Sequence, residues 1–299
     1  MMTYIPVHGK GALPTPKETR DGQFRLAATS PLTDWSTPFF VPVMFTQRDQ
    51  DGSSSCTAQA SGYYCEALNE IENGVKEQYS ARYIYSQVHA PGGGAYIWKA
   101  MSIPLKGLAS AVSIPDGDYS EATMTDSSLN VSADLDARAD KYAVIPRSNI
   151  DQLAQVIRDY HGFVTGFNGF DAMFAPDGTV ERWGKVDWGH AVYCDGYEIR
   201  NGVKCIRFKN SWSDQWGSKG WGYFPEAFVD SGYMFDLYTY AAIADLDPRY
   251  MIRDEVIAMY KFLRVKDYTE NDIAYWTGKH WLEMLRQGAK DYANDLNSL

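Results

Sequence analysis

Residues 50–65 read QDGSSSCTAQASGYYC, and within them Cys56 follows directly after three serines. The residues from Cys56 to Glu72 are compatible with a helix, which the Asn73-Gly74 pair would end. Cys56 would then lie at the start of that helix. A cysteine in this place could be a buried core thiol, half of a disulfide, a metal ligand or a nucleophile, and the rest of the chain has to decide between these roles.

The composition of the 299-residue chain is that of an ordinary globular protein, with 45% hydrophobic and 22% charged residues. This length is enough for one large domain or two modest ones. The net charge of -10 and the lack of any basic run argue against a nucleic-acid partner. The N-terminus has no apolar core of a signal peptide, and no apolar run reaches membrane-spanning length, so we expect no membrane association and a cytoplasmic or assembly-associated location.

The 4 cysteines do not form a metal-binding pattern. Their spacings are unlike the paired CxxC motifs of zinc sites, so we expect neither a metal nor another cofactor. Two disulfides remain possible, and Cys194 and Cys205 could face each other across a hairpin. A chain of this size does not need such cross-links. Cys65, Cys194 and Cys205 are best explained as structural residues.

Three regions differ in character along the chain. Residues 1–30 are rich in proline, glycine and charge, which indicates an extended N-terminal arm. Residues 31–247 carry the patterns of a folded domain, in which residues 105–140 read as loops with short elements. Residues 248–299 have apolar side chains at helical spacing, so we expect a small helical C-terminal module there, and a protein partner could bind to it.

Two apolar stretches predict a β-hairpin in the second half of the chain. HAVYCDGYEI (190–199) and VKCIRFKN (203–210) both read as strands, and Asn201-Gly202 between them is a strong signal for a tight turn. Such a hairpin brings the strand that begins with His190 alongside the strand that ends with Asn210. These two side chains can therefore be neighbours in the fold.

A nucleophilic cysteine needs a base that accepts its proton and a group that orients the base. Among the 5 histidines, His190 lies roughly 130 residues after Cys56, a separation typical of one class of cysteine nucleophile. Asn210 would be the group that orients the His190 ring. Each of these residues alone has an ordinary structural explanation, and their combination favours the nucleophile.

Four stretches of the chain, taken in order, resemble the sequence blocks of the papain-like cysteine peptidase family. The block around Asn210 is the most specific of the four. The resemblance covers roughly residues 31–240, and four blocks in the same order make a chance agreement improbable. The four stretches are DQDGSSSCTAQA (49–60), APGGGAYI (90–97), GHAVYCDGYEI (189–199) and KNSWSDQWGSKGWGYF (209–224).

The resemblance implies an α+β fold of two subdomains with an active cleft between them, followed by the C-terminal helical appendage. A mainly helical subdomain would carry Cys56 at a helix start, and an antiparallel, β-barrel-like subdomain would carry His190 and Asn210. The implied activity is that of a cysteine-type endopeptidase, which hydrolyses peptide bonds through a thioester acyl-enzyme without a metal or cofactor. The partner would be a peptide or protein substrate.

The resemblance assigns Cys56 as the nucleophile, His190 as its base and Asn210 as the residue that holds the His190 ring. The helix N-terminus and the imidazolium of His190 would both favour the thiolate of Cys56, so its pKa is expected to fall well below the free value of about 8.5. Trp212 would cover the hydrogen bond between His190 and Asn210 and exclude water from it.

The resemblance also implies residues that bind the substrate. Gln50, six residues before Cys56, would form an oxyanion hole together with the backbone N–H of Cys56. Gln47 competes for this role, and the spacing favours Gln50. Gly93 and Gly94 would let a peptide run along the cleft and pair with it backbone to backbone.

Several positions depart from the family pattern. Thr57 and Gln59 occupy a region that usually holds an aromatic residue, and Ser213 stands where the family prefers glycine. Ser53 replaces a cysteine that usually forms a disulfide near the cleft, which fits a reducing compartment. We expect no long helical inhibitory segment before the domain. None of these differences removes a catalytic group.

Two other functions would use the same residues. The chain could be a papain-fold structural or binding protein of a larger assembly, such as a phage virion, with weak or no peptidase activity. The atypical residues after Cys56 and the C-terminal module motivate this alternative. The same chemistry could also act on a cell-wall peptide or an isopeptide, although amidases of that kind are not expected to carry the block around Asn210.

Overall fold

The computed structural model describes residues 11–16, 34–130, 135–146, 149–241, 243–245 and 269. The chain divides into two compact units, Met1–Asp245 and Leu246–Leu299. Apart from Thr269, the second unit lies outside the described residues, as does most of the N-terminal arm. The helical module expected at 248–299 and its boundary therefore remain predictions. The described helices and strands all belong to the first unit.

The central helix is α2 (Cys56–Asn73). It begins at Cys56, after the N-cap residue Ser55, and it ends where Gly74 takes the left-handed conformation, with a φ of 70°. Both ends agree with the sequence prediction. The other described helices are α3 (Ala81–Val88), α4 (Ile97–Ser102), α5 (Glu121–Thr125), α6 (Ile150–Tyr160) and α7 (Glu226–Asp230).

The main sheet has seven strands, and all its described pairs are antiparallel. The strand order is β10-β9-β8-β7-β11-β6, and β2 also pairs with β8. The strands of this sheet are β2 (Phe39–Phe40), β6 (Tyr142–Val144), β7 (Phe163–Gly169), β8 (Trp188–Arg200), β9 (Val203–Lys209), β10 (Trp221–Pro225) and β11 (Met234–Tyr240). Two small sheets contain β1 (Ala12–Leu13) with β3 (Ala95–Tyr96), and β4 (Leu108–Ala109) with β5 (Leu135–Ala139) and β12 (Ile243–Asp245).

The predicted hairpin is confirmed as β8 and β9. Arg200 pairs with Val203 at the end of the ladder, and the turn residues Asn201 and Gly202 have positive φ angles of 50° and 79°. Positive φ at both central positions is what a two-residue hairpin turn requires, and asparagine and glycine tolerate it best.

The cysteines of this hairpin do not face each other. Cys194 pairs with Phe208 and Cys205 pairs with Glu198, so the expected juxtaposition of the two cysteines is wrong. A β-bulge between Cys194 and Gly196 shifts the register of this pair of strands. All 4 cysteines are free and buried in the structure, so none forms a disulfide.

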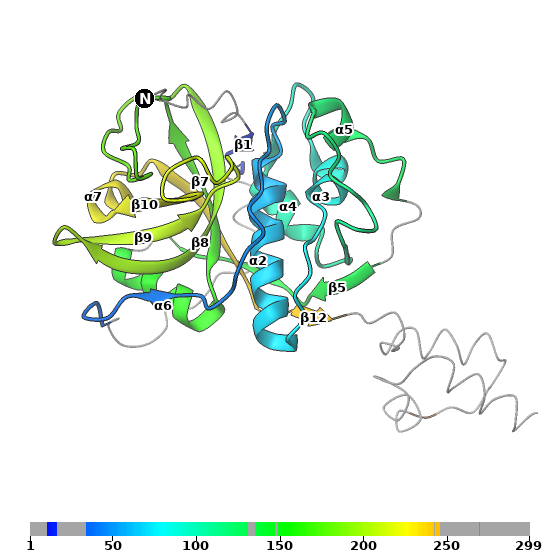
Figure 1. Cartoon of the computed structure of the whole chain (residues 1–299), viewed down its shortest axis with the longest axis horizontal. Coiled ribbons are helices and arrows are strands. Elements are labelled where there is room, and N and C mark those ends of the chain that lie inside the picture. Colours follow the sequence, from blue (N-terminus) through cyan, green and yellow to red (C-terminus); the bar gives the residue numbers. More distant parts are fainter. Residues whose placement is uncertain are drawn as a thin grey trace, which may run out of the picture. The chain divides into compact units, whose positions relative to one another are not determined.

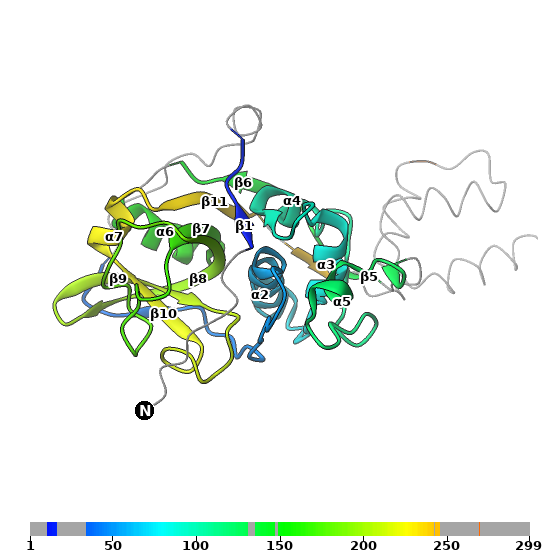
Figure 2. The same cartoon turned by 90° about the horizontal axis from the view of Figure 1, so that it is seen from above.

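Helix α2 lies between the main sheet on one side and α3, α4 and α5 on the other (Figures 1 and 2). It contacts β8 of the sheet as well as α3 and α4, and it is buried along most of its length. Helix α6 packs on β8 and β9. The α+β fold expected from the sequence is therefore present, with a helical part and an antiparallel sheet that meet at α2.

A buried arginine fixes the loop that leads into α2. The Arg48 guanidinium is fully buried and forms an ion pair with Glu66 of α2, and its second partner, Asp116, lies 3.6 Å away. It also donates hydrogen bonds to Gln59 Oε1 at 3.0 Å and to the Tyr79 carbonyl at 2.6 Å. A buried charge of this kind needs such partners to offset the loss of hydration. The loop is thereby held against the helix that starts with the nucleophile candidate.

None of the described helices is both long enough and apolar enough to cross a bilayer.

Candidate active site

Cys56 lies at the N-terminal end of α2 and is fully buried. Burial raises the pKa of its thiol to about 12, although the backbone N–H groups of Ala191, Thr57 and Gly11 lower it. Ala191 directly follows His190 in β8, so the sulfur lies beside the strand that carries the candidate base. The structure thus brings together two residues that are far apart in the sequence.

His190 is held by Asn210. The Nε2 atom of His190 lies 2.8 Å from Oδ1 of Asn210, and this oxygen also accepts a hydrogen bond from the Ser211 backbone N–H at 2.8 Å. Because an amide oxygen only accepts, the Nε2 atom carries the hydrogen in this pair. Nδ1 has no hydrogen-bond partner among the described residues, and it is therefore the nitrogen that can exchange a proton with a neighbouring group.

Aromatic rings enclose the His190 imidazole. Trp212 is fully buried and stacks on the imidazole, with ring centroids 4.3 Å apart and an angle of 27° between the planes. Phe167 meets the same ring edge-on at 5.6 Å. This burial lowers the pKa of His190 to about 4, although the hydrogen bond with Asn210 raises it. The predicted place of Trp212, over the pair formed by His190 and Asn210, agrees with this arrangement.

Gln50 joins the loop before Cys56 to the segment after Asn210. Its backbone N–H donates to the Ser211 carbonyl at 2.9 Å, and its side-chain Oε1 accepts from the Ser211 hydroxyl at 2.7 Å. Its side-chain Nε2 donates to the carbonyl of Ser53 at 2.9 Å. The side-chain amide of Gln50 is therefore fixed, fully buried, between the two loops that carry the nucleophile candidate and the orienting asparagine.

The competing glutamine, Gln47, has other partners. Its Nε2 donates to the carbonyls of Arg48 and Asn210, at 2.8 Å and 2.9 Å, and its Oε1 accepts a hydrogen bond from Lys209. Gln47 thus supports the backbone of Asn210. Because Gln47 binds to the backbone of Arg48 and Asn210 and Gln50 binds to that of Ser53, only Gln50 is connected to the loop just before Cys56.

Gly93 and Gly94 precede β3 and both have positive φ angles, of 95° and 78°. A Cβ atom on Gly94 would lie 2.6 Å from the carbonyl oxygen of Gly11, so only glycine permits this approach of the two backbones. The next residue, Ala95, donates its backbone N–H to the same oxygen at 2.7 Å. The glycine strip, residues 93 and 94, therefore lies against an extended peptide backbone.

That backbone belongs to the chain's own N-terminal arm, in residues 11–16 (GALPTP). Gly11 donates its backbone N–H to the Gly189 carbonyl at 3.0 Å, and a Cβ atom on Gly11 would lie 2.6 Å from Sγ of Cys56. β1 pairs with β3 in parallel and lies beside the N-terminal end of α2 (Figures 1 and 2). Segment 11–16 therefore covers Cys56, between the glycine strip and the residue that precedes His190.

The far end of segment 11–16 is also fastened. The backbone N–H of Thr15 donates to Asp236 Oδ2 at 2.5 Å, and the Thr15 hydroxyl lies 3.2 Å from the hydroxyl of Tyr238. Asp236 has a positive φ of 52° at an irregular register in β11. Of the arm expected at residues 1–30, only residues 11–16 are described, so the arm as a whole remains a prediction, and the place of these residues over Cys56 was missed by the sequence analysis. The available signal was Gly11, a small residue suited to a close approach of backbones.

The expected decrease in the pKa of the Cys56 thiol is not met in this covered arrangement. Burial dominates at both groups, since it raises the pKa of the Cys56 thiol to about 12 and lowers that of His190 to about 4. The neutral thiol and the neutral imidazole are therefore the favoured forms while segment 11–16 is in place. An ion pair of thiolate and imidazolium requires a more polar environment.

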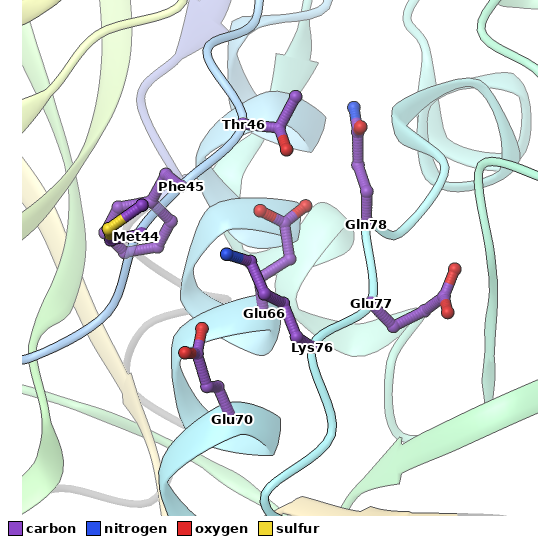
Figure 3. A pocket seen from close by; sticks show the side chains of 8 residues that line it. All are labelled: Met44, Phe45, Thr46, Glu66, Glu70, Lys76, Glu77 and Gln78. Carbon is purple, nitrogen blue, oxygen red and sulfur yellow. The ribbon is translucent and has the colours of Figure 1, made fainter.

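A separate pocket lies further along α2 (Figure 3). It is lined by Met44, Phe45, Thr46, Glu66, Glu70, Lys76, Glu77 and Gln78, and it contains none of the candidate site residues. Within the part of the chain that the structure describes, no group of three or more His, Cys, Asp or Glu side chains could hold a metal ion.

The model of the papain family cysteine proteases matches residues 31–230 of this chain. The match includes Cys56, His190 and Asn210, and it spans most of the first unit. The chain therefore belongs to the papain family of cysteine proteases. No curated protein sequence is significantly similar to it.

Solved structures with the same fold are themselves cysteine proteases. Xylellain from Xylella fastidiosa is 19% identical, with a TM-score of 0.65, and the match covers 81% of this chain and 99% of xylellain. The bromelain protease from Ananas comosus, solved with the inhibitor E64, is 19% identical with a TM-score of 0.59, covering 69% of this chain and 98% of bromelain. Procathepsin B from Trypanosoma congolense is 16% identical with a TM-score of 0.60, covering 79% of this chain and 87% of the procathepsin. At these identities the likeness shows the fold.

Proposed function

We propose that this chain is a cysteine endopeptidase that hydrolyses peptide bonds with Cys56 as nucleophile and His190 as base, and with Asn210 as the residue that positions the base. One observation carries the proposal. Helix α2 packs on β8, so Cys56 lies beside the strand that carries His190, while Asn210 holds Nε2 of His190 and leaves Nδ1 for proton exchange.

In the first half of the reaction, the thiol proton of Cys56 passes to Nδ1 of His190, and the thiolate attacks the carbonyl carbon of the substrate. The backbone N–H of Cys56 and the side-chain amide of Gln50 stabilise the oxyanion. Nε2 of His190 keeps its hydrogen bond to Asn210 throughout. The imidazolium then gives its proton to the leaving amine as the C–N bond breaks, and a thioester remains on Cys56.

In the second half, His190 takes a proton from a water molecule, which attacks the thioester carbonyl. The C–S bond breaks, the sulfur leaves as a thiolate stabilised by the imidazolium, and the carboxylic acid product departs. All proton transfers use groups of the protein and the substrate, so no cofactor is needed for this chemistry.

Segment 11–16 acts in this proposal as a cover and not as a substrate. Gly11 donates its backbone N–H to the Gly189 carbonyl, and its own carbonyl oxygen accepts the N–H of Ala95 instead of an oxyanion-hole donor. A scissile peptide must instead present its carbonyl carbon to the sulfur. A substrate therefore has to displace segment 11–16, and the enzyme is latent until it does.

The test is turnover of an unfolded protein substrate by the full chain and by Cys56→Ala. The proposal predicts turnover in the full chain and none above background in Cys56→Ala, with the fold of the variant unchanged by circular dichroism. Equal turnover in both proteins would overturn it. A papain-fold binding protein predicts no turnover by either protein, and an amidase of wall peptides predicts turnover only of cross-linked wall fragments.

A further inference from the structure

The loop before Cys56 and the glycine strip must keep a fixed separation, because one carries the nucleophile and the other aligns the substrate backbone. Ser53 stands where a family disulfide usually strengthens this region, and all 4 cysteines of the chain are free. A non-covalent connection therefore has to hold the loop and the strip together. The hydrogen bonds of the described residues provide such a connection.

Glu121, in the first turn of α5, accepts one hydrogen bond from the loop before Cys56 and another from Tyr85, which binds the glycine strip. Its Oε2 accepts the backbone N–H of Ser54 at 2.7 Å, two residues before the nucleophile. Its Oε1 accepts the hydroxyl of Tyr85 at 2.6 Å. The Tyr85 hydroxyl in turn accepts the backbone N–H of Gly94 at 2.8 Å. A single carboxylate thus connects the nucleophile loop to the strip through one tyrosine.

Each atom in this hydrogen-bond network has a donor or acceptor role that its chemistry allows. The Tyr85 hydroxyl donates its proton to a carboxylate oxygen and accepts with its own oxygen, so both of its roles are used. Burial raises the pKa of Tyr85, and Glu121 raises it further, so the hydroxyl keeps the proton that it donates. Bonds to an ionised carboxylate are stronger than those between neutral groups.

Close packing supports the same connection. A Cβ atom on Gly93 would lie 3.1 Å from the Ser54 hydroxyl oxygen and 3.5 Å from Oε1 of Glu121. The strip therefore lies directly against the loop and the carboxylate, and a Cβ atom at Gly93 would be tightly packed there.

We infer that Glu121 is a positioning residue for the peptidase reaction: it sets the distance between Cys56 and the strip that aligns the substrate backbone. The inference rests on the proposed function, since positioning matters only if peptides are turned over. This inference extends the candidate site to residues 105–140, a region that the sequence predicts only as loops with short elements. Glu121 itself does not touch the reacting atoms.

The test compares Glu121→Ala and Tyr85→Phe with two matched controls. Glu226→Gln removes a carboxylate from the first turn of α7, and Tyr83→Phe removes a hydroxyl from the same helix as Tyr85. We expect Glu121→Ala to lower kcat/KM for an extended peptide by about 10- to 100-fold. The Glu121→Ala and Tyr85→Phe losses should be non-additive in the double variant, because both break one network. Both controls should stay within about twofold.

Two further readouts separate positioning from a general loss of structure. Alkylation of Cys56 by iodoacetamide needs no aligned substrate backbone, so its rate should change by less than about twofold in Glu121→Ala as long as segment 11–16 stays in place. Glu121→Gln keeps one acceptor oxygen and should recover part of the lost kcat/KM. Equal losses in alkylation and turnover, or full turnover in Glu121→Ala, would overturn the inference.

Amide hydrogen exchange gives a result that does not depend on turnover. The Gly94 N–H should exchange faster in both Glu121→Ala and Tyr85→Phe than in the parent and the two controls. If the parent shows no turnover, the proposed function and the positioning role both fail, whereas an unchanged Gly94 exchange rate in the variants overturns the Glu121 connection alone.

Discussion

The N-terminal end of α2 and the middle of β8 each bury a cysteine completely, and burial raises the pKa of both thiols. The coverings of the two thiols differ. Cys194 lies inside the sheet, paired with Phe163 on one side and with Phe208 on the other. Cys56 is covered by Gly11, which belongs to a short segment held mainly by backbone hydrogen bonds.

On the proposed function, this difference separates a structural thiol, Cys194, from a latent nucleophile, Cys56. The cover of Cys194 cannot leave without breaking the main sheet, whereas the cover of Cys56 can leave while the sheet stays intact. The backbone amides of Ala191 and Thr57 also lower the pKa of the Cys56 thiol, whereas burial and the charge of Asp195 both raise that of Cys194. Complete burial therefore does not by itself exclude a catalytic role.

The largest expected effect contrasts the two thiols directly. Cys56→Ala should reduce kcat/KM for an unfolded protein substrate by more than about 1000-fold, because no other group can form the thioester. Cys194→Ala should keep kcat/KM within about threefold and lower the free energy of unfolding by about 1–2 kcal/mol. Steady-state kinetics and urea unfolding measure the two quantities. Similar kinetic losses in both variants would remove the distinction between the two regions.

The next effect concerns the loop before α2. Gln50→Ala should lower kcat by about 100-fold with little change in KM, because an oxyanion donor acts mainly in the transition state. Gln47→Ala, which removes a side chain that supports the backbone of Asn210, should lower kcat less. Steady-state kinetics on one peptide decides between them. A larger loss in Gln47→Ala would mean that the oxyanion role was assigned to the wrong glutamine.

The pH dependence of stability tests whether the covered site is neutral. Burial lowers the pKa of His190 to about 4, so between pH 6.5 and pH 4 the unfolded chain binds a proton that the folded chain does not. The free energy of unfolding should therefore fall by up to about 3 kcal/mol as the pH decreases through this window. His190→Gln should lack this part of the decrease. Equal pH slopes in urea unfolding of both proteins would contradict a buried neutral His190.

The smallest expected effect concerns the cover itself. A Cβ atom on Gly11 would lie 2.2 Å from the carbonyl oxygen of Ser54, so Gly11→Ala has to shift segment 11–16 away from Cys56. Overpacking of this kind costs about 1–3 kcal/mol, which should raise initial peptide turnover by about tenfold or more. Gly52→Ala, in the same loop region but with no atom within 4 Å of its Cβ, should leave turnover unchanged. No gain in Gly11→Ala would mean that segment 11–16 does not limit access.

The hairpin and the end of α2 could be predicted from the sequence because both rest on local signals. Asn201-Gly202 requires positive φ at both turn positions, and this turn brings the strands of His190 and Asn210 side by side, although the β-bulge between Cys194 and Gly196 shifts their register. Gly74 ends α2 because it takes the left-handed conformation, which glycine tolerates best. The assignment of Gln50, Gly93 and Gly94 came from the family resemblance, and the roles of these residues remain predictions.

The cover and the Glu121 connection could not be predicted because both depend on contacts between distant parts of the chain. Residues 11–16 carry no helical or strand period, and β1 forms only by pairing with β3. Glu121 lies far in sequence from Ser54, and no local pattern marks it as a partner of that backbone. The pKa of Cys56 was expected to fall because the helix N-terminus and His190 were considered without the burial that segment 11–16 imposes.

The most direct test of the account is alkylation of each cysteine by iodoacetamide from pH 4 to pH 9, located by mass spectrometry in the full chain and in Gly11→Ala. We predict that Cys56 reacts slowly below pH 9 in the full chain, where burial raises its pKa to about 12, and rapidly at pH 5 to 6 in Gly11→Ala. Cys65 and Cys194 should react equally slowly in both proteins. Slow labelling of Cys56 in both proteins, with the profile of a buried structural thiol, would contradict the claim that Cys56 is a nucleophile held latent by segment 11–16.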